Sequence, residues 1–221
     1  MTRQADHTHT ADPPSTTRQR LLEAAAEVFA AKGYRDARIS DICRRASANV
    51  AAVNYYFGQK EKLYAETWRH SFEQSIAAHP PDGGVAADAP ADQRFRGHIR
   101  AFLARGLGSD NAAFVIMHME LANPTGLLDE VRREMIGPLR QRAQSLIAEL
   151  LGDRATDRRV RLCEMSTMGQ CLHLIIRRLH KSLPCDANTL EDVPVSVLAD
   201  HIARFSLAGI DAIRNRGTDN E

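Results

Sequence analysis

The sequence predicts an all-α fold in two parts: an N-terminal three-helix helix-turn-helix domain and a larger helical C-terminal domain. Apolar residues recur three and four positions apart along most of the 221 residues, and no segment alternates apolar and polar residues as a half-buried strand would. Three short helical segments lie in the first third of the chain, with a tight turn between the second and the third. The length exceeds one typical domain, so a small module followed by a medium-sized domain accounts for the whole chain.

Composition excludes several classes of protein. Hydrophobic residues make up 43% of the chain and charged residues 26%, which is the balance of a folded protein with an aliphatic core. No run of about 18 uncharged apolar residues occurs, and residues 1–15 are polar and lack the apolar core of a signal peptide. We therefore expect a cytoplasmic protein that does not associate with a membrane.

Charge is distributed unevenly. Residues 15–64 contain nine Lys and Arg against five Asp and Glu, a local excess of +4, whereas the whole chain carries only +1. The remaining residues are therefore net acidic, by about −3. This asymmetry favours an N-terminal module that binds an anionic partner.

The four cysteines, Cys43, Cys163, Cys171 and Cys185, form neither a Cys-x-x-Cys pair nor the dense pattern of a secreted disulfide scaffold. We expect reduced, mostly buried thiols. A redox-sensing pair of Cys163 with Cys171 stays open as an alternative.

The N-terminal elements begin after a polar arm. Residues 1–15 contain Pro13-Pro14 and no periodicity, so we expect them to be flexible. Thr16 or Thr17 can cap a helix over 18–32, whose apolar residues follow the i, i+3, i+4, i+7 spacing and which Gly33 ends. A second short helix is expected over 39–46, followed by a turn.

The third helix presents a distinctive outer face. Asn49 can cap it, because its side-chain oxygen can accept from an amide of the first turn, and Gly58 closes it. At 100° per residue Val50, Val53 and Phe57 share one stripe, which we expect to face the core. The opposite face holds Ala51, Ala52 and Tyr55, flanked by Asn49 and Asn54. Small residues let a helix enter the major groove, and Asn and Tyr can hydrogen-bond there, so this segment is typical of a helix-turn-helix DNA-binding domain.

A longer helix is expected over 60–78, followed by an exposed connection over 79–91. The remaining helices are expected over 92–107, 112–122, 125–151, 156–182 and 194–215. Pro124 suits the start of the 125–151 helix, and Gly137-Pro138 should kink that helix or split it. The sequence thus predicts an arm over 1–15, a helix-turn-helix domain over 16–64 whose fourth helix continues to about 78, and a ligand-binding and dimerisation domain over 79–221.

The stretches FAAKGY (29–34), ISDICRRA (39–46) and NVAAVNYYFGQKEKLY (49–64) resemble the DNA-binding domain of the TetR family almost position for position. The resemblance implies a transcriptional regulator in which Tyr55 and Lys60 contact phosphates and residues 49–54 read bases. MELANPT (119–125), Gly137-Pro138-Leu139 and three residues of the third helix are similar to the CecR-like subgroup. The predicted DNA-binding residues are Thr17, Arg38, Ser40, Arg44, Asn49, Ala51, Ala52, Asn54, Tyr55 and Lys60.

Two positions depart from the family pattern. A hydroxyl residue often caps the second helix in this family, but that position is here Arg38. Either Ser40 caps a shorter helix or Arg38 contacts a phosphate directly. Ser47 replaces the glycine commonly found in the turn, which leaves the conformation of the turn open.

Two C-terminal helices carry apolar stripes with small residues, which suit a tightly packed bundle between two chains. Burial within one chain is the alternative for any single residue, and the family resemblance favours a homodimer. A pseudo-palindromic operator also requires a dimer, since two recognition helices must enter grooves about 34 Å apart. The predicted interface residues are Leu162, Gly169, Leu172, Ile176, Phe205, Ala208, Gly209 and Ala212.

A pocket for an unidentified small-molecule effector is expected among the middle helices, lined by residues that could equally be ordinary core. His118 and Glu120 could orient a polar group of the ligand or form a hydrogen-bonded structural pair. The predicted lining residues are Phe102, Phe114, Met117, His118, Glu120, Met165, Met168 and His173.

Enzyme motifs are missing from the sequence: it contains no G-x-S-x-G elbow, H-E-x-x-H, Walker loop or Rossmann fingerprint, and no metal-binding spacing of His and Cys. We therefore expect no catalysis, cofactor or metal. The favoured function is a ligand-responsive repressor that binds a double-stranded DNA operator as a dimer; ligand would shift the 60–78 helix and change the spacing of the two DNA-binding domains. The alternatives are a helix-turn-helix activator or DNA-binding protein without a small-molecule ligand, and a helical interaction protein that only resembles a repressor.

Overall fold

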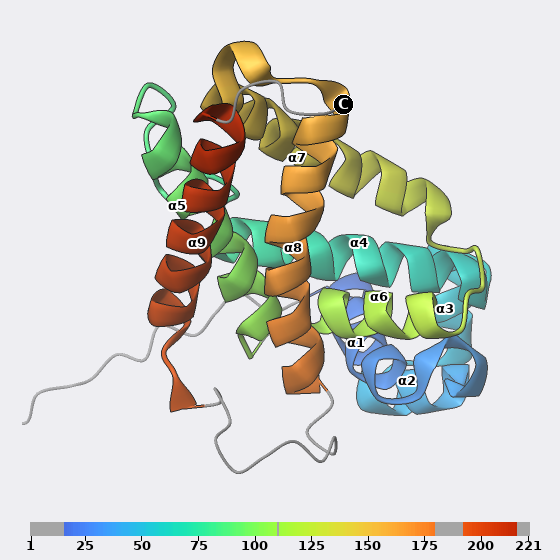
Figure 1. Cartoon of the computed structure of the whole chain (residues 1–221). Coiled ribbons are helices and arrows are strands. Elements are labelled where there is room, and N and C mark those ends of the chain that lie inside the picture. The colour runs from blue at the N-terminus through green and yellow to red at the C-terminus, as the bar shows by residue number, and fades with distance from the viewer. Residues whose placement is uncertain (1–15, 110, 180–191, 216–221) are drawn as a thin grey trace, which may run out of the picture.

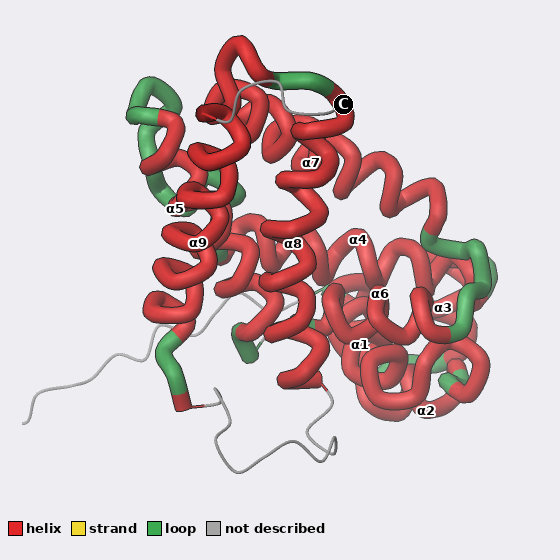
Figure 2. Tube along the Cα trace, viewed as in Figure 1, coloured by secondary structure: helices red, strands yellow, loops and turns green. Residues whose placement is uncertain are grey.

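The computed structural model describes residues 16–109, 111–179 and 192–215, and these residues form helices and loops without a β-strand (Figures 1 and 2). The predicted arm over 1–15 and Cys185 lie outside the described residues. The all-α prediction is confirmed. The helices are α1 (Thr17–Asp36), α2 (Ile39–Arg45), α3 (Val50–Phe57), α4 (Lys60–Ala78), α5 (Ala91–Leu107), α6 (Ala112–Ala122), α7 (Asp129–Leu151), the short 3-10 helix η1 (Gly152–Arg154), α8 (Asp157–Leu179) and α9 (Val195–Asn215).

Helices α1–α4 form the part of the molecule that we name the head, at the lower right of Figure 1. Its core contains Phe29, Ile42, Phe57, Tyr64 and Trp68, all 2% exposed or less. Helix α1 begins as predicted, since Thr16 Oγ1 accepts from the Gln19 amide at 3.2 Å. At Gly33 the backbone leaves the helical conformation (φ 70, ψ 177), as predicted, and a second helical stretch beyond this kink continues to Asp36.

The helix-turn-helix consists of α2 and α3. Arg38 stands at the N-cap of α2 without a capping hydrogen bond, and Ser40 lies inside the helix, so Ser40 does not cap a shorter helix. In the turn Ser47 has φ 49, which is the left-handed conformation that favours glycine. The turn therefore has the backbone conformation that suits the glycine commonly found at this position in the family. Asn49 Oδ1 accepts from the Ala52 amide at 2.9 Å, which confirms the predicted cap, and Gly58 ends α3 with φ 73.

We predict that Ser47→Gly stabilises the protein. The left-handed conformation strains an L-residue but not glycine, and this relief exceeds the extra entropy that glycine loses on folding, so the free energy of unfolding should rise by about 0.5–1 kcal/mol. The measurement is the midpoint of urea unfolding. Ala31→Gly, on the exposed surface of α1, is the control and should lower stability by about 1 kcal/mol. A lower midpoint for Ser47→Gly would contradict the strain that we infer.

Helices α5, α7, α8 and α9 form a second core, and we name this part the body. In Figure 1 α8 and α9 run side by side along the molecule. Helix α6 differs from its neighbours in the chain, because it packs on α1 and α4 of the head. Ala113 and Ile116 of α6, with Leu128 and Val131 at the start of α7, belong to the head's core. The two cores therefore do not divide the chain at a single point.

Helix α7 departs from the prediction at two places. It begins at Asp129 rather than at 125, so Pro124 lies in the preceding loop and does not open the helix. The reason is visible in the loop, where the Glu120 carboxylate accepts hydrogen bonds from the amides of Thr125 and Gly126 and turns the chain. Pro138 lies inside a single helix, so of the two predicted alternatives the split is wrong, and the kink stays a prediction.

Two further features bear on function class. Cys43, Cys163 and Cys171 are buried and free, and burial raises the pKa of the Cys171 thiol to about 12 and raises that of Cys163 as well. Both changes disfavour the reactive thiolate and hence the redox pair. None of the helices described is both long and apolar enough to cross a bilayer.

Candidate DNA-binding surface, junction and dimer face

The outer face of α3 is the centre of the candidate DNA-binding surface. Val53 and Phe57 are buried, so the opposite side of the helix points outward, and Tyr55 is 83% exposed. Val50 corrects the prediction: it is 51% exposed, because it lies in the first turn, beyond the part of α3 that reaches the core. Ala52 is half-buried against the core rather than at the front of the helix. The exposed residues of this face are Asn49, Val50, Ala51, Asn54 and Tyr55.

Two cationic side chains near α2 form ion pairs with the same carboxylate. Asp41 accepts from Lys32 Nζ at 2.7 Å and from Arg44 Nη2 at 2.9 Å. The hydrogen bond from Lys32 lowers the pKa of Asp41, which keeps this half-buried carboxylate charged. Arg44, like Arg38 and Ser40, is exposed on the surface of the head.

Thr17 and Lys60 lie at the starts of α1 and α4. Thr17 is half-buried and its Oγ1 accepts from Arg20 Nη2 at 3.1 Å. Lys60 Nζ lies 4.5 Å from the centre of the Tyr34 ring and 3.5 Å from the Arg35 carbonyl oxygen. Partial burial lowers the pKa of Lys60. The start of α4 thus presents a cation at a helix N-terminus, the arrangement that suits a phosphate.

Among the described residues, those predicted to line an effector pocket lie in different surroundings. Phe102 and Phe114 are half-buried and pack edge to face, 5.6 Å apart, against the body's core. Met117 packs instead against the head's core, and Met168 is half-buried. Met165 and His173 correct the prediction, because both are exposed on the surface of α8.

His173 lies in an open groove between α8 and α9. The groove has a volume of about 390 Å³ and a mostly apolar lining that includes Gly169, Leu174, Leu198 and His201. This groove adjoins the predicted dimer face.

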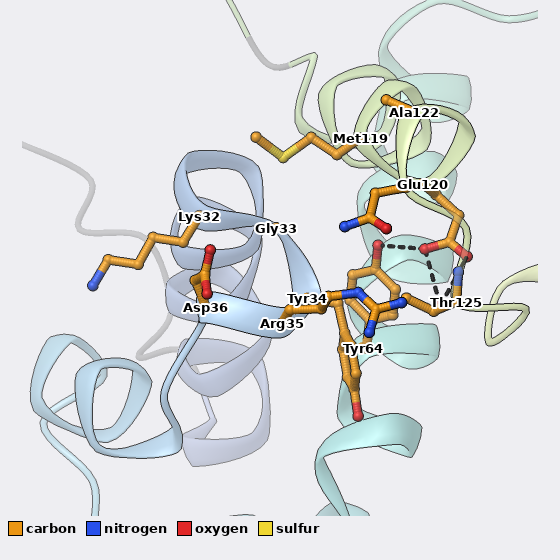
Figure 3. Close-up of a pocket in the computed structure, with 11 residues that line it drawn as sticks. Lys32, Gly33, Tyr34, Arg35, Asp36, Tyr64, Met119, Glu120, Ala122 and Thr125 are labelled. Atoms are coloured by element: carbon orange, nitrogen blue, oxygen red, sulfur yellow. Dashed lines mark hydrogen bonds between the residues drawn. The ribbon is translucent and has the colours of Figure 1, made fainter.

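Glu120 lies at the junction of α1, α4 and α6, beside a pocket of about 300 Å³ (Figure 3). Its carboxylate accepts from Tyr64 Oη at 3.2 Å, from the Thr125 amide at 2.7 Å and from the Gly126 amide at 3.0 Å. These bonds give Glu120 a structural role, which joins α6 to α4 of the head and to the loop before α7. Sequence reasoning missed Tyr64 and Thr125; the signal was the MELANPT segment, where a carboxylate precedes a Thr-Gly turn.

The predicted dimer face is apolar and exposed in the single chain. Phe205 on α9 is 64% exposed, and Leu162, Leu172 and Ile176 on α8 are also exposed. Gly169, Ala208, Gly209 and Ala212 are exposed small residues on the same two helices. Exposed large apolar side chains on two helices that pack together are typical of a surface that a partner covers.

Comparison with known proteins gives matches at both ends of the chain. Residues 21–67 match the tetR family of bacterial regulatory proteins, and residues 91–210 match the C-terminal domain of the HTH-type transcriptional dual regulator CecR. CecR of Shigella flexneri is 28% identical over 167 residues, which is 70% of this chain and 74% of CecR. The HTH-type transcriptional repressor NicS of Pseudomonas putida is 41% identical over 64 residues, 28% of this chain, and the match spans only 30% of NicS.

Solved structures share the fold. A TetR-like transcriptional regulator from Rhodococcus sp. RHA1 superimposes with a TM-score of 0.67 and 19% identity, over 91% of this chain and 99% of that one. The transcriptional regulator FadR from Bacillus subtilis, in complex with stearoyl-CoA, superimposes with a TM-score of 0.66 and 17% identity, over 86% and 97% of the two chains.

Proposed function

Because the chain belongs to the tetR family of bacterial regulatory proteins and carries a CecR-type C-terminal domain, we propose that it is a ligand-responsive repressor acting as a homodimer. Members of this family are transcriptional regulators, so the chain is a DNA-binding regulator and not an enzyme. The proposed dimer binds a pseudo-palindromic operator and leaves it when a small molecule binds. The repressor NicS supports the sign of the regulation.

The observation that carries the proposal is the exposed face of α3. Asn49 caps the helix, and Ala51, Asn54 and Tyr55 point outward from a head whose core residues are almost fully buried. A rigid scaffold with small residues at the front of the helix can bring Asn54 to base edges and Tyr55 to a phosphate. The other residues predicted to contact DNA surround this face; they are Thr17, Arg38, Ser40, Arg44 and Lys60.

The effector site is proposed among α5, α6 and α8, around Phe102, Phe114 and Met168. These side chains are half-buried and aromatic or flexible, which suits an adaptable apolar cavity. The fold neighbour FadR, which binds stearoyl-CoA, supports an effector with an apolar part. Ligand binding there would move α6 and α4 and thereby change the spacing of the two heads.

A dual regulator is the second candidate, because the match to CecR covers 70% of the chain. A promoter fused to a reporter, with and without the regulator, separates the two: repression lowers expression from the bound promoter, and activation raises it.

The test of DNA binding is a gel-shift titration of the purified protein on its own upstream DNA, at two salt concentrations and with an unrelated duplex as competitor. The expected result is a retarded protein–DNA band that persists in the presence of the competitor and weakens steeply as the salt concentration rises. Equal binding to both duplexes would contradict a specific operator in that region. A panel of small molecules added to the same assay then tests release.

We predict that Lys60→Ala weakens operator binding about 3- to 10-fold and lowers the slope of log K against log salt by about one, because one phosphate contact is lost. Asn54→Ala is the comparison, since it should alter operator preference and leave the salt slope unchanged. An unaltered slope in Lys60→Ala would exclude Lys60 from the phosphate contacts.

A further inference from the structure

Arg105 is a buried cation inside the body. It lies in the last turn of α5 and is 3% exposed, whereas arginine side chains are almost never fully buried unless they are paired. Within the described residues no carboxylate forms an ion pair with Arg105. Burial lowers the pKa of Arg105 to about 10, so the side chain still carries its charge at neutral pH. The body therefore contains one buried positive charge that no acidic residue in the described part of the chain neutralises.

The hydrogen bond that Arg105 makes uses a small part of its capacity. Nη1 donates to the His79 carbonyl oxygen at 2.7 Å, at the point where α4 ends. A guanidinium has five N–H donors, and two of them side by side match the two oxygens of one carboxylate. The end of a helix offers only a partial negative charge, so the bond to His79 offsets the buried charge incompletely.

The ionisable neighbours of this region are basic. His98 lies two turns before Arg105 on α5, and its pKa is lowered to about 4, first by burial and then by the positive charges of Arg105 and Arg142. A hydrogen bond to the Pro81 backbone opposes this change without cancelling it. His98 is therefore neutral at pH 7, and the buried charge that a ligand meets here is a single positive one.

Aromatic side chains adjoin the guanidinium. Arg105 Cζ lies 6.0 Å from the centre of the Phe102 ring, one turn earlier on α5. Phe102 packs edge to face with Phe114 of α6, and both rings are half-buried. Gly106 lets α8 approach α5 closely, since a Cβ at this position would lie 2.2 Å from Ile175 Cδ1. The cation thus lies directly beside the aromatic pair of the proposed effector site.

We propose that Arg105 binds the carboxylate of the effector, and that the effector is a monocarboxylate whose apolar chain lies against Phe102 and Phe114. Charge-assisted, two-pronged hydrogen bonds between arginine and carboxylate are strong, and buried surroundings strengthen them further. One negative charge neutralises the one buried positive charge, whereas a phosphate dianion would leave an excess charge in the same surroundings. This proposal rests on the proposed function, because it names the chemical class of its ligand, but the binding itself is tested without DNA.

The test is calorimetric titration of the full chain with hexanoate, decanoate and tetradecanoate, each beside the alcohol of the same chain length. Arg105→Met removes the charge and keeps an unbranched side chain. Arg105→Gln also removes the charge but keeps an N–H donor for the His79 carbonyl. The matched control is Arg100→Met, because Arg100 is an exposed arginine of α5 whose Nη2 donates to another loop carbonyl, that of Gly83, at 2.8 Å.

We expect at least one of the three carboxylates to bind the wild type, and Arg105→Met to weaken that binding about 30-fold or more, because a buried charge pair loses one partner. Arg105→Gln should show a similar loss. The alcohol of the same length should bind Arg105→Met at least as tightly as the wild type, since it has no charge to pair. Arg100→Met should bind the carboxylate within about twofold of wild type, because its charge is exposed and screened.

The gel-shift assay then tests whether this site is the effector site. The carboxylate that binds should release the wild-type protein from its operator, and release of Arg105→Met should need about 30-fold more of it. Carboxylate binding that leaves operator affinity unchanged would overturn the role of Arg105 in effector binding. If the wild type shows no specific operator binding, the proposed function fails, while the calorimetric titration still decides the carboxylate site.

Three results would overturn the carboxylate site itself. The first is equal losses of carboxylate and alcohol binding in Arg105→Met, which would mean that Arg105 only supports the fold. The second is that none of the three carboxylates binds the wild type more tightly than it binds Arg105→Met. The third is tighter binding of decyl phosphate than of decanoate with the same dependence on Arg105, which would assign the site to a phosphate. Should Arg105→Met not fold, as judged by circular dichroism, Arg105→Gln decides the question.

Discussion

Phe205→Glu should convert the proposed dimer to a monomer and weaken operator binding by about 100-fold or more. Phe205 is the most exposed large apolar side chain of α9, and in a two-fold interface one substitution places a charge on both sides. A buried charge without a partner costs far more than the lost apolar contact. A monomer then binds one half-site only, and the loss of the linked second site costs a factor of about 10²–10⁴.

The measurement is the mass in solution by light scattering, followed by the gel-shift titration. Ser196→Glu is the control, because it introduces the same charge on α9 at an exposed position about half a turn around the helix from Phe205. It should remain dimeric and bind the operator as the wild type does. A dimeric Phe205→Glu would place the interface on another face.

Ala51→Glu should abolish specific binding, with a loss of roughly 100-fold, while the protein stays folded and dimeric. Ala51 is exposed in the first turn of α3, where a glutamate suits the helix dipole and disturbs no packing. In the proposed complex the same carboxylate would enter the major groove beside the phosphates, where like charges cost several kcal/mol.

Ala31→Glu provides the matched control, since Ala31 is exposed on α1 of the same head and lies outside the proposed DNA face. Its operator affinity should stay within about threefold of wild type, the size of a remote electrostatic effect. Similar losses in the two variants would mean that net charge, and not the face of α3, governs binding.

Much of the helical organisation could be predicted because its signals are local. Helix α4 was expected over 60–78 and is found at Lys60–Ala78, and the expected range 112–122 matches α6. The caps at Thr16 and Asn49 depend on a side chain and amides three residues away, so they can be recognised without knowledge of the rest of the fold. The apolar stripes on α8 and α9 also follow from periodicity alone.

Other features depended on residues distant in sequence. Tyr64 and Glu120 are 56 positions apart and are joined by a hydrogen bond. Glu120 also accepts from the Thr125 and Gly126 amides in the turn before α7, a helix whose start periodicity alone placed four residues too early. Val50 and Ala52 exchanged their expected environments, because helical spacing gives a side chain's direction and does not show how far the core extends beneath it.

The sequence by itself thus determined the family, the all-α class and the helix-turn-helix, since each of these follows from short-range spacing and capping. The tertiary structure decided that α6 packs with the head, that Met165 and His173 are exposed on α8, and that Glu120 joins two helices. The physical reason is that burial and hydrogen-bond pairing are properties of neighbours in space, and many different arrangements of the same amphipathic helices satisfy the same periodic pattern.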